Sequence, residues 1–110
     1  LITGSKDGNI KHFDLLSKSE IRQKYQAHSK DWCNDICWVE YGPKYLNENS
    51  LIASVGRDKA VRIWNPNSKF DCVAERTSAH SSSINSVCSY NDTLFTGSDD
   101  FNIHMWKLGL

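Results

Sequence analysis

The chain has 110 residues, of which 39% are hydrophobic and 24% are charged, proportions that are ordinary for one small globular domain and exclude a disordered chain. Thirteen basic residues balance thirteen acidic ones, so no net charge attracts the whole molecule to nucleic acid or to an anionic membrane. The apolar runs are far shorter than the roughly 20 residues of a membrane-spanning helix, and the first residues do not form a secretion signal, so we expect a soluble chain.

Residues 1–14, at the start of the chain, have a pattern that recurs in residues 51–65 and 94–108. Each segment starts with an apolar pair, passes through small residues to an aspartate, and then alternates polar and apolar residues up to an aromatic residue six places further on. The aspartates are Asp7, Asp58 and Asp100, and the aromatic residues are Phe13, Trp64 and Trp106. Alternation with a period of two on either side of turn-forming residues predicts two antiparallel strands joined by a tight turn.

The segments between these copies also have strand-like patterns. We expect strands at residues 20–26, 32–39, 70–77 and 84–90, with Ala-His pairs at residues 27–28 and 79–80. Residues 40–50 are polar and contain Gly42-Pro43, which predicts a long surface loop. The three aspartates are spaced by 51 and then by 42 residues, which brackets the period of about 40–45 residues of a four-stranded propeller blade. The pattern leaves no room for a helix.

The copies resemble WD repeats over essentially the whole chain. Ala-His stands where that family usually has Gly-His, and Phe-Asp, Trp-Asn and Trp-Lys stand where it usually has Trp-Asp. The resemblance implies an all-β fold, a fragment of a WD-repeat β-propeller with about two and two-thirds blades of four-stranded antiparallel sheets. We expect the blades to comprise residues 1–26, 27–78 and 79–110, at the C-terminal end of a larger propeller. Because such a piece exposes two raw flanks, it should be unstable or self-associating on its own.

The resemblance also implies a hydrogen-bonded tetrad in a blade, made of a His, a Ser or Thr, the turn Asp and the Trp. The candidates are His28, Ser54, Asp58 and Trp64 in the second blade and His80, Thr96, Asp100 and Trp106 in the third. The first blade retains only Thr3 and Asp7, and Phe13 lacks the indole donor. A half-buried carboxylate is tolerated when hydrogen-bond donors satisfy its lone pairs, so we expect these residues to stabilise the fold.

One face of the disk is expected to bind a partner protein. By family position this face offers Lys6, Lys30, Trp32, Arg57, Ser81, Ser83 and Asp99. Trp32 is an aromatic residue of the kind that anchors protein interfaces, or else it packs over the loop that follows His28. Arg57 and its neighbour Lys59 would contact an acidic peptide or a phosphate, or else they only keep the turn soluble.

Residues 24–38 and 82–98 are similar to the last blades of the WD-repeat tail of kinesin-like motors of the kinesin-4 family. The chain departs from that pattern by one extra residue after His28 and by the loop at residues 40–50. The resemblance implies a non-catalytic tail that contacts cargo or microtubules, in the cytoplasm and associated with the cytoskeleton. The motor's ATPase would lie elsewhere, because the sequence contains no GxxxxGKS or GxxxxGKT phosphate-binding loop.

Two other kinds of function keep some support from the sequence. A cysteine-dependent enzyme would use Cys33 or Cys37 with His28, but no orienting third group can be named. A lipid- or nucleic-acid-binding module would use the basic residues of the partner-binding face, and its binding would depend steeply on salt.

The metal-ligating residue types do not form a site with a known ligand spacing. The cysteines at positions 33, 37, 72 and 88 lie in strand-like segments, so we expect buried, reduced thiols. Asp99 and Asp100 are adjacent, but no EF-hand ligand series follows them. His12 and His104 belong to different repeats, and nothing in the sequence brings them together. We expect no bound metal ion and no cofactor.

Overall fold

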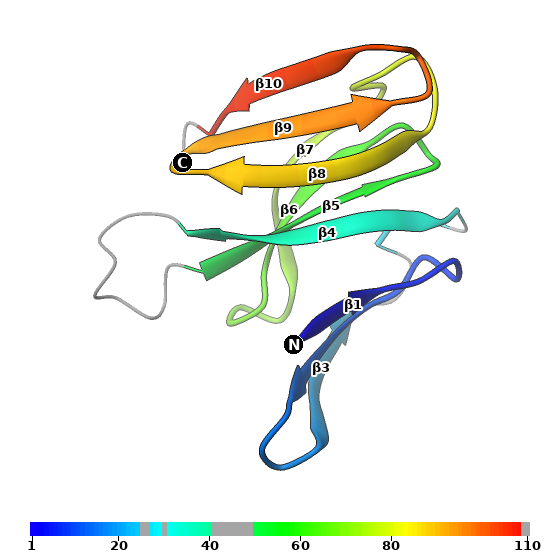
Figure 1. Cartoon of the computed structure of the whole chain (residues 1–110). Coiled ribbons are helices and arrows are strands. Elements are labelled where there is room, and N and C mark those ends of the chain that lie inside the picture. The colour runs from blue at the N-terminus through cyan, green and yellow to red at the C-terminus, as the bar shows by residue number, and fades with distance from the viewer. Residues whose placement is uncertain (25–26, 30, 41–49, 109–110) are drawn as a thin grey trace.

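Strands make up the regular secondary structure of the residues that the computed structural model describes, which are 1–24, 27–29, 31–40 and 50–108. They form three antiparallel sheets that lie side by side (Figure 1). The N-terminal sheet contains β1 (Ile2–Gly4), β2 (Ile10–Asp14) and β3 (Ser19–Lys24); the central sheet contains β4 (Cys33–Glu40), β5 (Ser50–Gly56), β6 (Val61–Asn65) and β7 (Asp71–Arg76); and the C-terminal sheet contains β8 (Ile84–Tyr90), β9 (Thr93–Ser98) and β10 (Ile103–Lys107). Within each sheet the strands are neighbours in the order of the sequence.

The observed strands agree largely with those that the sequence pattern predicts. The all-β prediction is confirmed, and the four strands that were predicted with their own bounds, at residues 20–26, 32–39, 70–77 and 84–90, each begin and end within two residues of those bounds. The predicted loop at residues 40–50 falls almost entirely outside the described residues. The described part of the chain contains no helix that is long and apolar enough to cross a membrane.

The same tight turn joins two strands in all three sheets. The residue after each turn aspartate lies in the left-handed region, with φ of 83° at Gly8, 68° at Lys59 and 69° at Phe101. Its N–H donates to the carbonyl three residues earlier, at 3.0, 3.2 and 3.2 Å. The aspartate carboxylate accepts the N–H two residues further on, at 2.9, 3.2 and 2.9 Å. This side-chain bond holds a turn that is uncommon for residues other than glycine, so the aspartate stabilises the turn through contacts within a few residues of itself.

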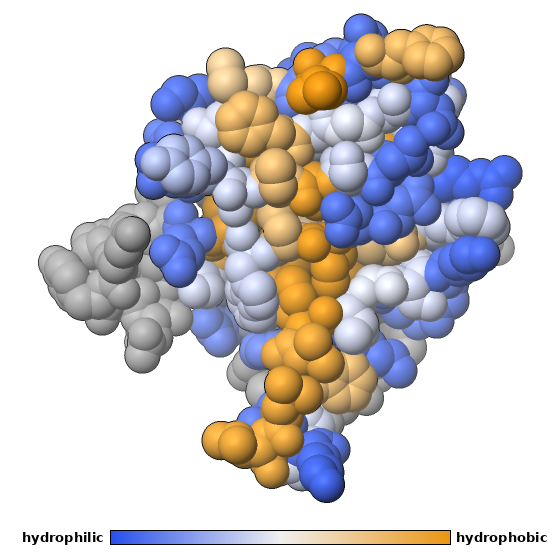
Figure 2. Space-filling model, viewed as in Figure 1, coloured by the Kyte–Doolittle hydropathy of each residue, from blue (hydrophilic) through white to orange (hydrophobic). Residues whose placement is uncertain are grey.

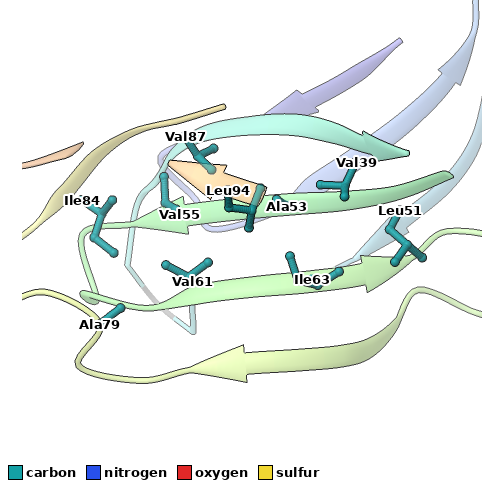
Figure 3. Packing of buried hydrophobic residues seen from close by; sticks show 10 residues of the cluster. All are labelled: Val39, Leu51, Ala53, Val55, Val61, Ile63, Ala79, Ile84, Val87 and Leu94. Atoms are coloured by element: carbon teal, nitrogen blue, oxygen red, sulfur yellow. The ribbon is translucent and has the colours of Figure 1, made fainter. Parts of the chain in front are cut away.

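The larger hydrophobic core lies between the central and C-terminal sheets (Figure 3). It contains Val39, Leu51, Ala53, Val55, Val61, Ile63, Ala79, Ile84, Val87 and Leu94. Because side chains alternate along a strand, Leu51, Ala53 and Val55 of β5 face this core while Ile52 and Ser54 point the other way. The burial of Ile52 and Ser54 shows that β5 is covered on both faces.

A second, smaller core fills the space between the N-terminal and central sheets. Its buried members are Ile10, Ala27, Cys33, Ile52, Trp64 and Phe70. β1 packs against β4, and β4 in turn packs against β8. The first strand of the central sheet therefore lies between the two neighbouring sheets, as Figure 1 shows.

Polar side chains at an irregularity in β4 also tie the central sheet to the C-terminal one. The strand register shifts between Cys33 and Asp35. The side-chain amide of Asn34 there donates to Ser83 Oγ at 3.0 Å and to the Ile84 carbonyl at 2.8 Å. The N–H of Val87 donates to Asp35 Oδ2 at 2.9 Å. Asn34 is exposed and Asp35 is partly buried, so these bonds join the two sheets at the rim of their contact.

The outer strand of the C-terminal sheet leaves apolar side chains exposed. Ile103 and Met105 of β10 are exposed, whereas Val61 and Ile63, at the matching positions of the central repeat, are buried. Figure 2 shows that apolar side chains also form a band across one face and reach the far end of the molecule. Leu16, between β2 and β3, is almost fully exposed. The outer face of β10 is thus uncovered in the described part of the chain.

The prediction of four buried thiols is wrong for two of them. All four cysteines are free; Cys33 is buried and Cys37 is partly buried, but Cys72 and Cys88 are exposed. Cys72 lies on β7, at the edge of the central sheet. Cys88 follows the buried Val87 on β8, so strand alternation turns it away from the core.

Candidate functional site

Four polar side chains of the central sheet form a continuous chain of hydrogen bonds, which we call the central tetrad: His28, Ser54, Asp58 and Trp64. Trp64 Nε1 donates to Ser54 Oγ at 2.8 Å. Ser54 Oγ lies 2.8 Å from His28 Nε2, and His28 Nδ1 lies 2.9 Å from Asp58 Oδ1. A carboxylate can only accept, so Nδ1 donates to Asp58, and in the neutral imidazole Nε2 then accepts from the serine hydroxyl. Each residue thereby fixes the orientation of the next.

The C-terminal sheet has the same arrangement, the C-terminal tetrad, in His80, Thr96, Asp100 and Trp106. Trp106 Nε1 donates to Thr96 Oγ1 at 2.9 Å, and that oxygen lies 2.8 Å from His80 Nε2. His80 Nδ1 lies 2.9 Å from Asp100 Oδ2. The ring of His104 stacks on His80, with ring centroids 4.0 Å apart. The role of both tetrads as blade locks stays a prediction.

The N-terminal sheet holds only a remnant of this arrangement. Thr3 and Asp7 are both exposed. The Asp7 carboxylate accepts the backbone N–H of Asn9 at 2.9 Å and its side-chain amide at 3.2 Å. The bonds of Asp7 are therefore those of its own turn.

One member of the central network was missed by the sequence analysis. Arg62 Nη1 donates to Asp58 Oδ2 at 2.7 Å, and Arg62 Nε donates to Glu75 Oε2 at 3.1 Å. The strand register places Arg62 opposite Glu75. The signal available in the sequence was an arginine four residues after the turn aspartate, in the strand that ends at Trp64.

The Asp58 carboxyl is held in its charged form by this network. Burial raises its pKa, but hydrogen bonds from His28 and Arg62 outweigh that effect and bring the pKa from 3.8 to about 2. For Asp100, burial likewise raises the pKa, whereas the N–H groups of Asn102 and Ser81 and the ring of His80 lower it further, well below its usual range. Both aspartates are thus anions at any pH near neutral.

Stability should depend on the ionisation of Asp58 at acid pH. The folded-state pKa lies below the unfolded value, so the carboxylate stabilises the fold above about pH 4, and this contribution is lost as the pH falls toward about 2. We expect the free energies of unfolding of the wild type and of Asp58→Asn to differ at neutral pH and to converge as acid is added. Urea denaturation across that range measures both. A difference that stays constant down to the lowest pH would contradict the ionised network.

The two thiols that were considered together with His28, Cys33 and Cys37, are poor nucleophiles. Burial, and then the nearby Asp35 carboxylate, raise the pKa of Cys33 to about 12. Burial raises the pKa of Cys37 to about 11, although a hydrogen bond with Ser89 opposes it. A nucleophilic cysteine needs a lowered pKa, and both ring nitrogens of His28 are already engaged in the central tetrad. The arrangement is the reverse of an activated cysteine–histidine pair.

The histidines considered as metal ligands are not brought together. His12, on β2, makes an edge contact with Trp38, whereas His104, on β10, stacks on His80. Within the described ranges, no three His, Cys, Asp or Glu side chains are placed to hold a metal ion.

Three residues of the predicted partner-binding face come together as a group that we call the Trp32 cluster: Lys6, Trp32 and Arg57. Lys6 Nζ lies 4.4 Å from the centroid of the Trp32 ring, and Arg57 Cζ lies 5.0 Å from it. Lys6 comes from the β1–β2 turn of the N-terminal sheet, and Arg57 comes from the β5–β6 turn of the central sheet. Trp32 remains 38% exposed. The cluster is therefore an aromatic surface flanked by two cations, at the seam between two sheets.

Backbone contacts hold the Trp32 cluster in place. The N–H of Arg57 donates to the Trp32 carbonyl at 2.9 Å, and the N–H of Cys33 donates to the Ser5 carbonyl at 3.1 Å. The second bond links the start of β4 to the turn that carries Lys6. A Cβ at Gly56 would lie 2.4 Å from the Trp32 carbonyl oxygen, so only glycine allows this approach.

The other residues predicted for this face have different surroundings. Ser81 donates its backbone N–H to Asp100 at 3.1 Å, so it supports the C-terminal tetrad. Ser83 Oγ accepts from Asn34, and Asp99 accepts from the side chain of Asn85 at 2.6 Å. Lys30 lies outside the described residues.

Comparisons with known proteins agree with the repeats. The sequence profile of the family described as "WD domain, G-beta repeat" matches residues 19–65 and 70–107. The human kinesin-like protein KIF21A is 33% identical over 107 residues, and the Caenorhabditis elegans kinesin-like protein klp-12 is 32% identical over 109 residues. Both alignments cover 97% of this chain and 6% of the relative, so the chain spans a small part of these proteins.

A solved structure has the same architecture. The crystal structure of Sqt1 from Chaetomium thermophilum superimposes with a TM-score of 0.78 at 23% sequence identity, and the match covers 98% of this chain and 31% of that chain. At this identity the likeness concerns the fold alone. It confirms the predicted fold class, a fragment of a few propeller blades.

Proposed function

This chain belongs to the WD-repeat family, and we propose from this that it is a non-catalytic protein-interaction surface within a larger propeller. Members of this family typically serve as scaffolds for protein interactions, and the function of such a fold resides in surface sites rather than in the fold itself. We assign residues 1–26, 27–78 and 79–110 to blades at the C-terminal end of that propeller, by the repeat boundaries in the sequence. The protonated state of the Cys33 and Cys37 thiols supports the non-catalytic assignment.

The kinesin-like relatives give this surface a context. The identity of about a third extends over nearly the whole chain in KIF21A and klp-12. We therefore propose that the chain is part of the tail of a kinesin-like motor, where it contacts microtubules or cargo, in the cytoplasm and at the cytoskeleton. Motor chemistry would reside in other parts of such a protein.

The single observation that carries the proposal is the exposed ring of Trp32 between Lys6 and Arg57. An indole offers a large, rigid contact area, and tryptophan and arginine are enriched among the residues that dominate binding energy at protein interfaces. Trp32 does not pack fully against its own chain, because the residue remains 38% exposed. A partner that covers it would gain apolar burial and desolvate the two cation–π contacts.

Microtubule co-sedimentation of the complete propeller tests the proposal. We expect Trp32→Ala to weaken binding about tenfold or more, since truncating a hot-spot tryptophan typically costs about 2 kcal/mol or more of binding free energy. The matched control is Trp38→Ala, because Trp38 is 37% exposed but lies further along β4, beside His12.

The outcomes are distinct. Binding that falls for Trp32→Ala and not for Trp38→Ala supports a microtubule-contacting tail and places the contact at the Trp32 cluster. Equal losses for both variants would contradict that placement. Wild-type propeller that stays in the supernatant at low and at moderate salt would rule out the microtubule as the partner.

A further inference from the structure

The two cations of the Trp32 cluster have little local neutralisation. Arg57 Nε lies 3.9 Å from Asp31 Oδ1, and the side chains are 56% and 43% exposed, so this ion pair is weak and exchangeable. Among the described residues, no carboxylate lies within 4 Å of the Lys6 ammonium. The Asp58 carboxylate, next to Arg57 in sequence, is already taken by His28 and Arg62.

This charge is a local property of the cluster. The whole chain has no net charge, so a cationic pair stands out only because the fold brings Lys6 and Arg57 to the same indole ring. The guanidinium group matches a carboxylate with two parallel hydrogen bonds, whereas the ammonium group acts as a mobile point charge. Together they offer two binding positions for anions, and both positions lie next to the apolar ring of Trp32.

We infer that the Trp32 cluster binds an acidic polypeptide segment, one rich in Glu and Asp, whose carboxylates pair with Lys6 and Arg57 while its chain packs on Trp32. This inference rests on the proposed protein-binding function and names the class of partner. Two cations and one indole suit a peptide. Nucleic acids and anionic membranes present dense phosphate charge and are typically bound by larger sets of basic residues.

The location of the cluster adds a consequence. Lys6 belongs to the N-terminal sheet, whereas Trp32 and Arg57 belong to the central sheet, so a bound peptide contacts both sheets at their seam. A ligand that binds only the docked arrangement stabilises it by mass action. The acidic peptide should therefore raise the melting temperature of the protein, and the rise should disappear when the two cations are removed.

Fluorescence anisotropy with the full-length protein tests the inference. The probes are labelled oligo-glutamate and oligo-glutamine peptides of equal length. We expect oligo-glutamate to bind, to weaken as salt is added, and to lose about tenfold or more in affinity in the double variant Lys6→Gln, Arg57→Gln, which removes two charge-assisted contacts. Lys107→Gln is the matched control, because Lys107 is an exposed lysine that pairs with Asp92 on the C-terminal sheet.

Several results would overturn the inference. These are equal affinity for the two peptides, an unchanged affinity in the double variant, or tighter binding of a single-stranded oligonucleotide or of anionic vesicles than of oligo-glutamate. The test is separate from that of the proposed function. If Trp32→Ala abolishes microtubule binding while oligo-glutamate does not bind, the protein-binding function stands and the acidic partner is wrong. If oligo-glutamate binds and microtubules do not, the proposal of a microtubule partner is wrong and the inference of an acidic partner stands.

Discussion

Asp58→Ala should lower the free energy of unfolding of the complete propeller by about 3 kcal/mol, because it removes one partner from a buried charged network. The carboxylate accepts from His28, from Arg62 at 2.7 Å, and from the N–H of Ala60 in its own turn. Without it, the partly buried Arg62 guanidinium keeps the ion pair of its Nε with Glu75 but loses the carboxylate partner of its Nη1. The turn also loses the bond that holds Lys59 in the left-handed region. Urea denaturation gives the free energy directly.

Two further aspartates serve as controls for Asp58. Asp99→Ala should change stability by no more than about 0.5 kcal/mol, because Asp99 is an exposed turn residue bonded to the side chain of Asn85. Asp7→Ala should have a smaller effect than Asp58→Ala, because Asp7 bonds only within its turn in the described residues. If Asp58→Ala and Asp99→Ala were equally destabilising, the assignment of the tetrad would be wrong.

The repeats allowed much of the fold to be predicted because its determinants are local. A turn aspartate bonds the N–H two residues further on, and a strand of period two follows it, so both signals lie within a few consecutive residues. The tetrads were named from a family resemblance, and hydrogen bonds join the residues named. The chemistry of the groups agrees with this, since an indole N–H can only donate, a carboxylate can only accept, and a hydroxyl and an imidazole can do both and so join the two.

The contacts between sheets could not be predicted, because they depend on docking and strand register. The bonds from Asn34 to the C-terminal sheet require the register shift in β4 and the approach of β8. Lys6 and Trp32 are 26 positions apart and belong to different sheets, so no periodicity relates them. The exposure of Cys88 depends on which face of β8 meets the central sheet.

The tetrad and the binding surface are physically connected through one backbone segment. Gly56 ends β5 and immediately precedes Arg57, and its neighbours in space are the Trp32 carbonyl and the ring of His28. The central tetrad orients His28, and Gly56 packs between the His28 ring and the Trp32 backbone, so the tetrad also supports the backbone that carries Trp32. Stability and binding at this seam should respond together to a change in that segment.

Gly56→Ala should be among the most damaging single substitutions in the chain, with an expected loss of about 3 kcal/mol of unfolding free energy. The added Cβ would lie 2.4 Å from the Trp32 carbonyl oxygen and 2.8 Å from the His28 ring, and neither group can move without breaking the Trp32–Arg57 backbone bond or the central tetrad. Binding at the Trp32 cluster should fall in the same variant. Gly97→Ala is the matched control, because its Cβ would meet only the hydroxyl of Ser86, at 2.9 Å, which can rotate away. Chemical denaturation of both variants decides the matter: equal losses would show that the close approach at Gly56 does not set the stability of this seam.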